Sequence, residues 1–277
     1  MQLIDLIKYA LSEDIGDGDH TSLSTIPSTA TGKARLIVKE EGILAGMRIA
    51  PIVFELVDPK IVFNQLLQDG TAVKPGDIAF TIEGPSISLL SAERLVLNFM
   101  QRMSGIATVT NLYTKELEGL HTKVIDTRKT TPLMRELEKE AVRIGGGGNH
   151  RFGLFDMILI KDNHVDFAGG ISQAIAAAQQ YLKKTGKDLK IEIEVRNFDE
   201  LNEAIEFGGI DRIMLDNFTP EMLTQAVKII DGRFETEASG GITLNTLRSY
   251  ALSGVDFISV GALTHHIKSL DLSLKAF

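Results

Sequence analysis

Apolar and polar positions follow two different periods in the first part of the chain. Residues 2–12 carry apolar side chains at helical spacing, whereas residues 32–83 contain short strand-like runs. Lys74-Pro75-Gly76-Asp77 predicts a tight turn between two of these strands. A long helical pattern with a wide apolar face then covers residues 88–117. The pattern predicts a small α/β domain with strands at 34–39, 61–67 and 78–82 and a helix at 47–56, ending near residue 108.

From residue 122 onwards, short apolar runs alternate with helical segments. This alternation predicts parallel strands joined by right-handed crossovers, as in a βα barrel or a doubly wound sheet. The predicted strands cover residues 124–125, 157–160, 191–195, 213–215, 234–238 and 257–260, and the predicted helices cover 133–144, 171–182, 198–207, 220–230 and 244–252.

Composition narrows the function classes. A chain of 277 residues is long enough for two domains or one large one. Its net charge of −8 argues against a general nucleic-acid or anionic-membrane partner. The absence of cysteine excludes disulfides and thiolate catalysis. Residues 1–10 lack the pattern of a signal peptide, and no apolar run approaches the ~18 residues of a membrane span, so we expect a soluble, cytoplasmic protein.

Polar residues or glycines follow every predicted strand of the second part. The carboxyl ends of parallel strands meet at one edge of a sheet or barrel, where such folds bind their ligands. We therefore expect these segments to form one site. They are residues 126–129, 161–164, 194–196, 216–217, 239–241 and 261–265.

Basic residues are concentrated in the first of these segments and in a loop that follows four consecutive glycines, Gly145 to Gly148. Guanidinium groups grip carboxylates or phosphates with paired hydrogen bonds, and lysines act as point charges. A set of this kind in an acidic chain predicts a substrate with several negative groups. Its members are Arg128, Lys129, Arg151 and Lys161, with His150 beside them.

The last strands carry features that suit a phosphate and a metal ion. Ser239-Gly240-Gly241 and Gly261-Ala262 offer backbone amides ahead of helix starts, the usual phosphate position in βα barrels. Glu194 and Asp216 end neighbouring strands and suit a magnesium ion or a developing sugar cation. Glu192 lies on the same side of its strand as Glu194, which also makes it a candidate for a deep ion pair.

An acidic segment near the N-terminus, residues 13–19, offers a different metal hypothesis. Its spacing resembles a calcium loop, but Thr25 stands where such a loop needs a bidentate glutamate. A solvated turn is the favoured interpretation.

Several of these motifs together resemble the quinolinate phosphoribosyltransferases, also called nicotinate-nucleotide pyrophosphorylases. The resemblance covers almost the whole chain in order. Its motifs are residues 13–21, Glu93-Arg94, 97–99, 104–108, the whole stretch 126–164, and residues 215–217, 239–242 and 259–265.

The resemblance implies a magnesium-dependent transfer of ribose 5-phosphate from phosphoribosyl pyrophosphate to the nitrogen of quinolinate. Carbon dioxide is lost, and nicotinate mononucleotide forms for NAD biosynthesis. The implied fold is an N-terminal α/β sandwich, residues 1–108 completed by about 267–277, on an open α/β barrel of about six strands, residues 109–266. Members of the family work as homodimers in which one N-terminal domain closes the barrel mouth of the partner.

The resemblance also implies roles for individual residues. Arg94 would reach across the dimer interface to the substrate carboxylates, and Arg128, His150, Arg151 and Lys161 would hold quinolinate. Lys129, Glu194 and Asp216 would serve phosphoribosyl pyrophosphate and Mg²⁺, with metal contacts made directly or through substrate and water. The 5-phosphate would bind Ser239, Gly240, Gly241, Gly261, Ala262 and His265. Four groups carry the catalytic prediction: Lys129, Lys161, Glu194 and Asp216.

The chain departs from the family pattern at Leu133, where a glycine is common, at His266, and in a longer link at residues 208–210. Three other interpretations compete with the resemblance. They are a molybdenum-transport-associated relative with the same fold, an aldolase-type barrel with Lys161 as Schiff base, and a non-catalytic module that senses a phosphate or a dinucleotide.

Overall fold

The computed structural model describes residues 2–277, which form two compact units. The N-terminal unit consists of residues up to Asn111 together with Thr131–Gly146 and His266–Phe277, and the barrel unit consists of Leu112–Thr130 and Gly147–His265. Residues 131–146 thus fall in the N-terminal unit, whereas the sequence pattern placed them in the barrel domain. The two units are described separately below.

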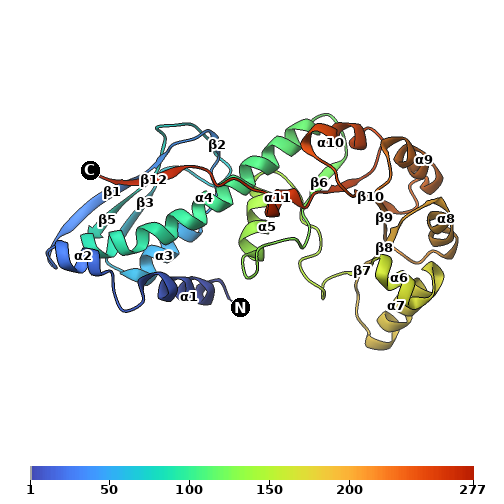
Figure 1. Cartoon of the computed structure of the whole chain (residues 1–277), viewed down its shortest axis with the longest axis horizontal. Coiled ribbons are helices and arrows are strands. Elements are labelled where there is room, and N and C mark those ends of the chain that lie inside the picture. The colour runs from blue at the N-terminus through green and yellow to red at the C-terminus, as the bar shows by residue number, and fades with distance from the viewer. Residues whose placement is uncertain (1) are drawn as a thin grey trace. The chain divides into compact units, whose positions relative to one another are not determined.

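The N-terminal unit is built on an antiparallel sheet of four strands in the order β12-β1-β5-β3 (Figure 1). Its strands are β1 (Thr31–Val38), β3 (Val62–Gln65), β5 (Ile78–Pro85) and β12 (Leu272–Ala276). A separate two-stranded ladder joins β2 (Gly42–Ile43) to β4 (Ala72–Val73). The chain's C-terminal strand therefore completes a sheet that its N-terminal part begins.

Five helices belong wholly or largely to this unit: α1 (Leu3–Ile15), α2 (His20–Thr25), α3 (Ile49–Val57), α4 (Ser86–Glu116) and α5 (Arg135–Ile144). The apolar side of α3 packs on the sheet, where Phe54 and Phe80 meet edge to face with ring centroids 6.0 Å apart. The predicted turn at residues 74–77 is confirmed, with the Asp77 N–H donating to the Lys74 carbonyl at 3.1 Å.

The acidic segment before α2 caps that helix. Asp19 accepts the backbone N–H of Ser22 at 3.0 Å and its hydroxyl at 2.5 Å, as an N-cap residue does. These hydrogen bonds lower the pKa of Asp19. The carboxylate is therefore accounted for by a helix cap at the end of an exposed turn, in line with the favoured interpretation of this segment.

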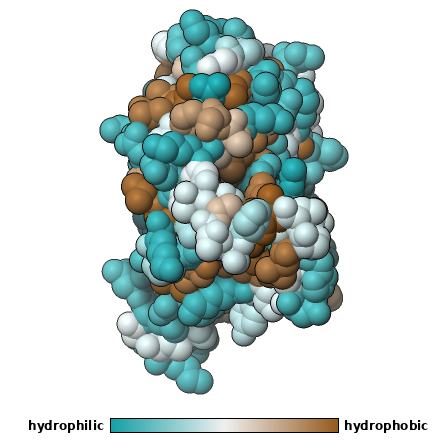
Figure 2. Space-filling view, turned by 90° about the vertical axis from the view of Figure 1, so that its left-hand side faces the viewer, coloured by the Kyte–Doolittle hydropathy of each residue, from teal (hydrophilic) through white to brown (hydrophobic). Residues whose placement is uncertain are grey.

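The N-terminal unit also exposes apolar side chains. Figure 2 shows apolar patches separated by polar residues on one face of the molecule. Tyr9, Leu23 and Leu90 are among the exposed large apolar residues of this unit. Among residues 2–277, no helix combines the length and the apolar run that a membrane span requires.

The barrel unit contains a six-stranded parallel sheet in the order β6-β11-β10-β9-β8-β7. The sheet is curved, with helices along its convex side (Figure 1). No pairing between β6 and β7 closes the barrel within residues 2–277, so the predicted open α/β barrel of six strands is confirmed. The strands are β6 (Lys123–Ile125), β7 (Ile158–Ile160), β8 (Ile191–Val195), β9 (Arg212–Asp216), β10 (Glu235–Ser239) and β11 (Phe257–Ser259).

Helices connect the strands in the predicted alternation. They are α6 (Asp162–Ala168), α7 (Ile171–Thr185), α8 (Phe198–Phe207), α9 (Pro220–Ile230), α10 (Leu244–Ala251) and α11 (Ala262–His265). The short helices α6 and α11 were not predicted, because each begins within a polar strand exit that lacks an apolar period of its own. Because the six strands are parallel, their exits lie at one edge of the sheet, as expected.

Candidate active site

A cavity of about 330 Å³ opens at the carboxyl edge of the barrel sheet. Four of its lining residues are the cations that the sequence singled out, in a chain whose net charge is −8. The walls combine basic, hydroxyl and apolar groups. The lining residues are Thr127, Arg128, Lys129, His150, Arg151, Leu159, Lys161, Met214, Glu237, Ser239 and Ser259.

Asp126, to which the sequence analysis gave no individual role, organises two segments of the site. Its carboxylate is fully buried and accepts the His150 backbone N–H at 2.9 Å and the Asn149 side-chain amide at 2.6 Å. Gly148 continues the contact, because its N–H donates to the Val124 carbonyl at 2.9 Å. The glycine-rich loop is thereby fastened to the end of β6, which places His150 and Arg151 at the cavity.

Arg128 and Lys129 follow β6 directly and are exposed. Neither forms an ion pair with a carboxylate among the residues that the structure describes. Lys129 packs closely against Gly261, just beyond the end of β11. A side-chain carbon added at Gly261 would lie 2.9 Å from the Lys129 Cδ and 2.9 Å from the His265 Nε2. Two cations thus line the cavity with their charges uncompensated.

Lys161, at the end of β7, forms an ion pair with Glu194 near the end of β8. Glu194 is almost fully buried, whereas about 45% of the Lys161 side chain is exposed. The same carboxylate accepts the Asp162 N–H at 3.4 Å. The Lys161 amine is engaged by this carboxylate, whereas a Schiff-base lysine needs an amine that is free to attack a carbonyl, so the contact disfavours the Schiff-base interpretation.

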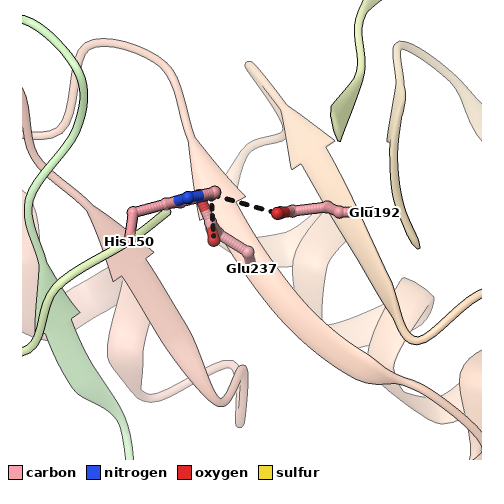
Figure 3. A group of neighbouring side chains, drawn as sticks. All are labelled: His150, Glu192 and Glu237. Atoms are coloured by element: carbon pink, nitrogen blue, oxygen red, sulfur yellow. Dashed lines mark ion pairs between the residues drawn. The ribbon is translucent and has the colours of Figure 1, made fainter. Parts of the chain in front are cut away.

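His150 sits between two buried glutamates (Figure 3). Its Nε2 lies 3.0 Å from Glu192 Oε2 and 3.5 Å from Glu237 Oε2, and all three side chains are buried. Its Nδ1 accepts the backbone N–H of Arg151 at 2.6 Å, so the ring proton belongs on Nε2, facing the glutamates. Glu192 thus lies deep in the barrel beside His150, on the inward side of its strand. Glu237 was not predicted, because residues 234–238 indicated only a strand and the sequence does not show which of its polar side chains is buried.

Burial changes the protonation of this pair of glutamates. It raises the pKa of Glu192 to about 7, against the opposing effect of the Arg212 charge. It raises the pKa of Glu237 to about 8, and the negative charge of Glu192 adds to the increase. Burial and the neighbouring charge of Arg128 lower the pKa of Arg151. The cavity is therefore lined by closely spaced cations, and the buried acids Glu192 and Glu237 beneath them retain protons.

The exits of β10 and β11 carry the glycines of the predicted phosphate site. Gly240 and Gly241 have φ values of 101° and 63°, which other residues rarely adopt. A side chain at Gly240 would collide with Asn217, whose backbone N would lie 2.9 Å from the added carbon. The Thr264 hydroxyl donates to the Lys129 carbonyl at 2.8 Å, which joins α11 to the β6 exit. Because these positions are glycines, no side chain covers the backbone at this strand exit.

The comparisons with known proteins identify the family. The family model for the N-terminal domain of quinolinate phosphoribosyl transferase matches residues 19–104, and that for its C-terminal domain matches residues 106–275. A Bacillus subtilis protein described as a probable nicotinate-nucleotide pyrophosphorylase (carboxylating) is 44% identical over 99% of this chain and 93% of its own length. The chain belongs to the quinolinate phosphoribosyltransferase family.

Other members of the quinolinate phosphoribosyltransferase family show the same relationship. A Nicotiana tabacum protein named quinolinate phosphoribosyltransferase (decarboxylating) 1b is 45% identical over 98% of this chain and 81% of its own length. The structure of the nicotinate-nucleotide pyrophosphorylase from Francisella tularensis matches with a TM-score of 0.92 and 44% identity, covering 99% of this chain and 95% of that one. The α/β sandwich and open barrel are thus the family's fold.

The site residues predicted from the family resemblance fall into three groups. Arg128, Lys129, His150, Arg151, Lys161 and Ser239 line the cavity. Glu194, Asp216, Gly240, Gly241, Gly261, Ala262 and His265 lie at or just beyond strand ends of the same barrel unit. Arg94 belongs to α4 in the N-terminal unit and is exposed.

The two carboxylates predicted to hold a metal differ in their surroundings. Both oxygens of Glu194 face donors of this chain, Lys161 and the Asp162 N–H. Asp216 is half-buried, and only its Oδ2 accepts a described hydrogen bond, from Asn217 at 2.6 Å. Mg²⁺ in nucleotide sites often takes one or two carboxylates together with substrate phosphates and water. Asp216 fits that donor set, and Glu194 fits as the partner of Lys161.

Proposed function

We propose that this chain transfers the phosphoribosyl group of phosphoribosyl pyrophosphate to the nitrogen of quinolinate at the cavity of the barrel unit. The products are nicotinate mononucleotide, pyrophosphate and carbon dioxide, as the family assignment specifies. One observation supports the placement above the others. Four cations line one cavity in an acidic protein, and among residues 2–277 only Lys161 of the four forms an ion pair with a carboxylate. Such a cavity suits two polyanionic substrates.

Quinolinate carries two adjacent carboxylates, which suit the guanidiniums of Arg128 and Arg151. A guanidinium can bind a carboxylate with two parallel hydrogen bonds. The positive charges of Arg128 and Arg151 repel each other, and a dianion that enters between the two arginines offsets this repulsion. Lys161 contributes a third charge, and the structure adds a role for His150, whose ring orients the Arg151 backbone. Because these groups are positioned before binding, little reorganisation is needed.

The phosphoribosyl pyrophosphate binds towards the exits of β9, β10 and β11. Its 5-phosphate is held by Ser239, the backbone amides of Gly240, Gly241, Gly261 and Ala262, and the side chain of His265. Lys129, which packs against Gly261, stabilises the negative charge that develops on the departing pyrophosphate. The half-buried carboxylate of Asp216 stabilises a positive charge, either on the sugar carbon or on a cation bound to the substrate.

Magnesium is the metal that this reaction implies. When bound, it would neutralise part of the pyrophosphate charge and polarise the bond to the leaving group. Asp216 is the residue whose free oxygen would hold it. Glu194 keeps Lys161 in place, so its catalytic contribution runs through that lysine.

The proposal extends to a homodimer in which Arg94 serves the partner's site. Arg94 is exposed on α4, one helical turn beyond Leu90, which is also exposed. An exposed arginine next to exposed apolar side chains is the composition of a protein interface. We expect the dimer to act in the cytoplasm, and the absence of cysteine is consistent with a reducing compartment.

A turnover assay tests the function. Purified protein is mixed with phosphoribosyl pyrophosphate, Mg²⁺ and either quinolinate or nicotinate, and pyrophosphate and mononucleotide are quantified. We expect turnover with quinolinate and little with nicotinate, which lacks the second carboxylate. Binding of quinolinate without turnover would favour a sensing module, and absence of both would contradict the proposal.

A further inference from the structure

The reaction needs a proton that the cations of the site cannot readily supply. When the carboxylate next to the ribosylated nitrogen leaves as carbon dioxide, its bonding electron pair stays on the ring carbon. That carbanion becomes product only after it gains a proton. Arginine and lysine hold their protons tightly, and their charges are engaged by the substrates. A group with a proton to donate should therefore lie at the cavity wall.

We propose that Glu237, which forms a buried pair with Glu192 at the floor of the cavity, donates this proton. Glu237 lines the cavity and is fully buried within the chain, at 0% exposure. One carboxylate oxygen of Glu237, one of Glu192 and one ring nitrogen of His150 all lie within 4.8 Å of one another. This inference rests on the proposed function, since it assigns a step of that reaction.

The contacts of Glu237 indicate which of its oxygens carries the proton. Oε2 faces two donors, the Arg212 guanidinium at 3.1 Å and the His150 Nε2 at 3.5 Å. An oxygen that faces donors acts as an acceptor, so it has no need of a proton of its own. Oε1 is buried and has no hydrogen-bond partner in the structure. A proton on Oε1 therefore displaces no donor of this chain, and it is the proton that Glu237, a lining residue of the cavity, would give to the substrate.

The surroundings of the pair favour a retained proton. Glu192 and Glu237 are both buried and both lie close to the His150 Nε2, and two negative charges at so short a separation disfavour ionisation of both groups. The charged and titratable groups facing the pair are Arg212 on β9, His150 from the glycine loop, and Arg151 and Lys161 at the cavity. The Ser259 hydroxyl on β11 also faces the pair. Burial raises the pKa values of both acids, in agreement with a proton retained at neutral pH.

The proposed step balances in atoms and charge. The bond between the ring carbon and the carboxylate breaks, carbon dioxide departs, and the electron pair remains on the carbon. That pair forms a bond to the proton of Glu237, and the electrons of the former O–H bond stay on the carboxylate. Arg212 stabilises the new negative charge at the 3.1 Å contact. Water returns a proton to the pair after product release.

A Glu237→Gln variant tests this step, because the amide keeps the size of the side chain and cannot act as the acid. Pyrophosphate and carbon dioxide are measured in one single-turnover reaction. We expect equal rates in the wild type and, in the variant, carbon dioxide release at least ~10-fold slower than pyrophosphate release. The dicarboxylate mononucleotide should then accumulate, since an unprotonated carbanion recaptures carbon dioxide. Glu237→Asp, which restores an acid, should recover part of the lost rate.

Glu235→Gln is the matched control. It removes a carboxylate two residues away on the same strand, one that pairs with Arg212 but does not line the cavity. Equal release of both products by Glu237→Gln would overturn the inference.

The wild type provides a second measurement if that variant fails to fold. Its carbon dioxide release should lag behind pyrophosphate release as the pH rises past about 8, the pKa of Glu237. A constant ratio across this range would also overturn the inference. Failure of the wild type to release pyrophosphate would instead contradict the proposed function.

Discussion

The buried carboxylate of Asp126 accepts the backbone N–H of His150 at 2.9 Å. This bond joins the exit of β6 to the glycine-rich loop, 24 residues further along the chain. Asp126 directly precedes the basic turn after β6, and His150 directly precedes Arg151. The two halves of the cation cluster are therefore held together by hydrogen bonds to a residue that does not line the cavity.

Replacement of Asp126 by alanine should loosen the glycine loop and lower the affinity for quinolinate. Hydrogen bonds to charged groups contribute roughly 1.5–3 kcal/mol each, and this change removes at least two of them. We expect KM for quinolinate to rise at least ~10-fold, with a smaller change for phosphoribosyl pyrophosphate. Asp231→Asn, an exposed change at the end of α9, is the control and should leave both values unchanged.

Arg128→Ala should weaken quinolinate binding much more than phosphoribosyl pyrophosphate binding. The variant leaves one substrate carboxylate without its bidentate partner, a loss of about 2–5 kcal/mol in a desolvated site. Calorimetric titration of each substrate measures the difference. Arg233→Gln serves as the control, because that guanidinium only donates to carbonyls at the end of α9. Equal losses for the two ligands would show that Arg128 is not the quinolinate ligand.

The sequence predicted the fold well because its signals are local. Strand and helix periods identify the barrel strands individually, and parallel strands necessarily share one carboxyl edge. The residues of the cavity were found for the same reason, since Arg128 and Lys161 stand at strand ends. Asp126 and Glu237 were missed because their importance comes from long-range contacts, with the glycine loop and with His150, which no periodicity reports.

Leu133 illustrates a second limit of sequence reasoning. The family resemblance marked it as a departure, where a glycine is common. The structure shows why the position matters, because Leu133 has φ of 68° and is exposed. Glycine adopts this backbone region without strain, whereas leucine does not. The turn is retained here by its neighbours, including the Met134 N–H bond to the Thr131 carbonyl at 3.0 Å.

Removal of Mg²⁺ with a chelator should abolish turnover, and added Mg²⁺ should restore it. Asp216→Asn should raise the Mg²⁺ concentration needed for half-maximal rate, since it removes the carboxylate charge that suits the cation. Glu194→Gln should leave that requirement nearly unchanged and reduce kcat instead, because it leaves Lys161 without its partner. If Glu194→Gln alone shifts the Mg²⁺ requirement, the two assignments are reversed.

The buried glutamates should make stability fall as the pH rises. Their folded-state pKa values, about 7 for Glu192 and about 8 for Glu237, lie above the ordinary value of 4.5. The folded protein therefore binds more protons than the unfolded chain between about pH 4.5 and 8, and its stability decreases across this window. The Tm of Glu237→Gln relative to the wild type should rise between pH 5 and 8. A constant difference in Tm would contradict the raised pKa.

A mixing experiment tests whether Arg94 serves a site on another subunit. Arg94→Ala removes the arginine from the N-terminal unit, and Lys161→Ala disables the cavity of the barrel unit. Each homodimer should be nearly inactive, for different reasons. If Arg94 acts in trans, subunit exchange creates a heterodimer with one site that has both residues intact.

Activity should therefore appear on mixing and approach a quarter of the wild-type value at equal amounts of the two variants. Half of the dimers are then heterodimers, and each has one working site. A mixture of Arg94→Ala with a variant that carries both Arg94→Ala and Lys161→Ala is the control. Its subunits exchange in the same way, but no mixed dimer contains a complete site. If Arg94 acts within its own chain, every mixed dimer still lacks one essential residue per site, and the mixture should stay as inactive as its components.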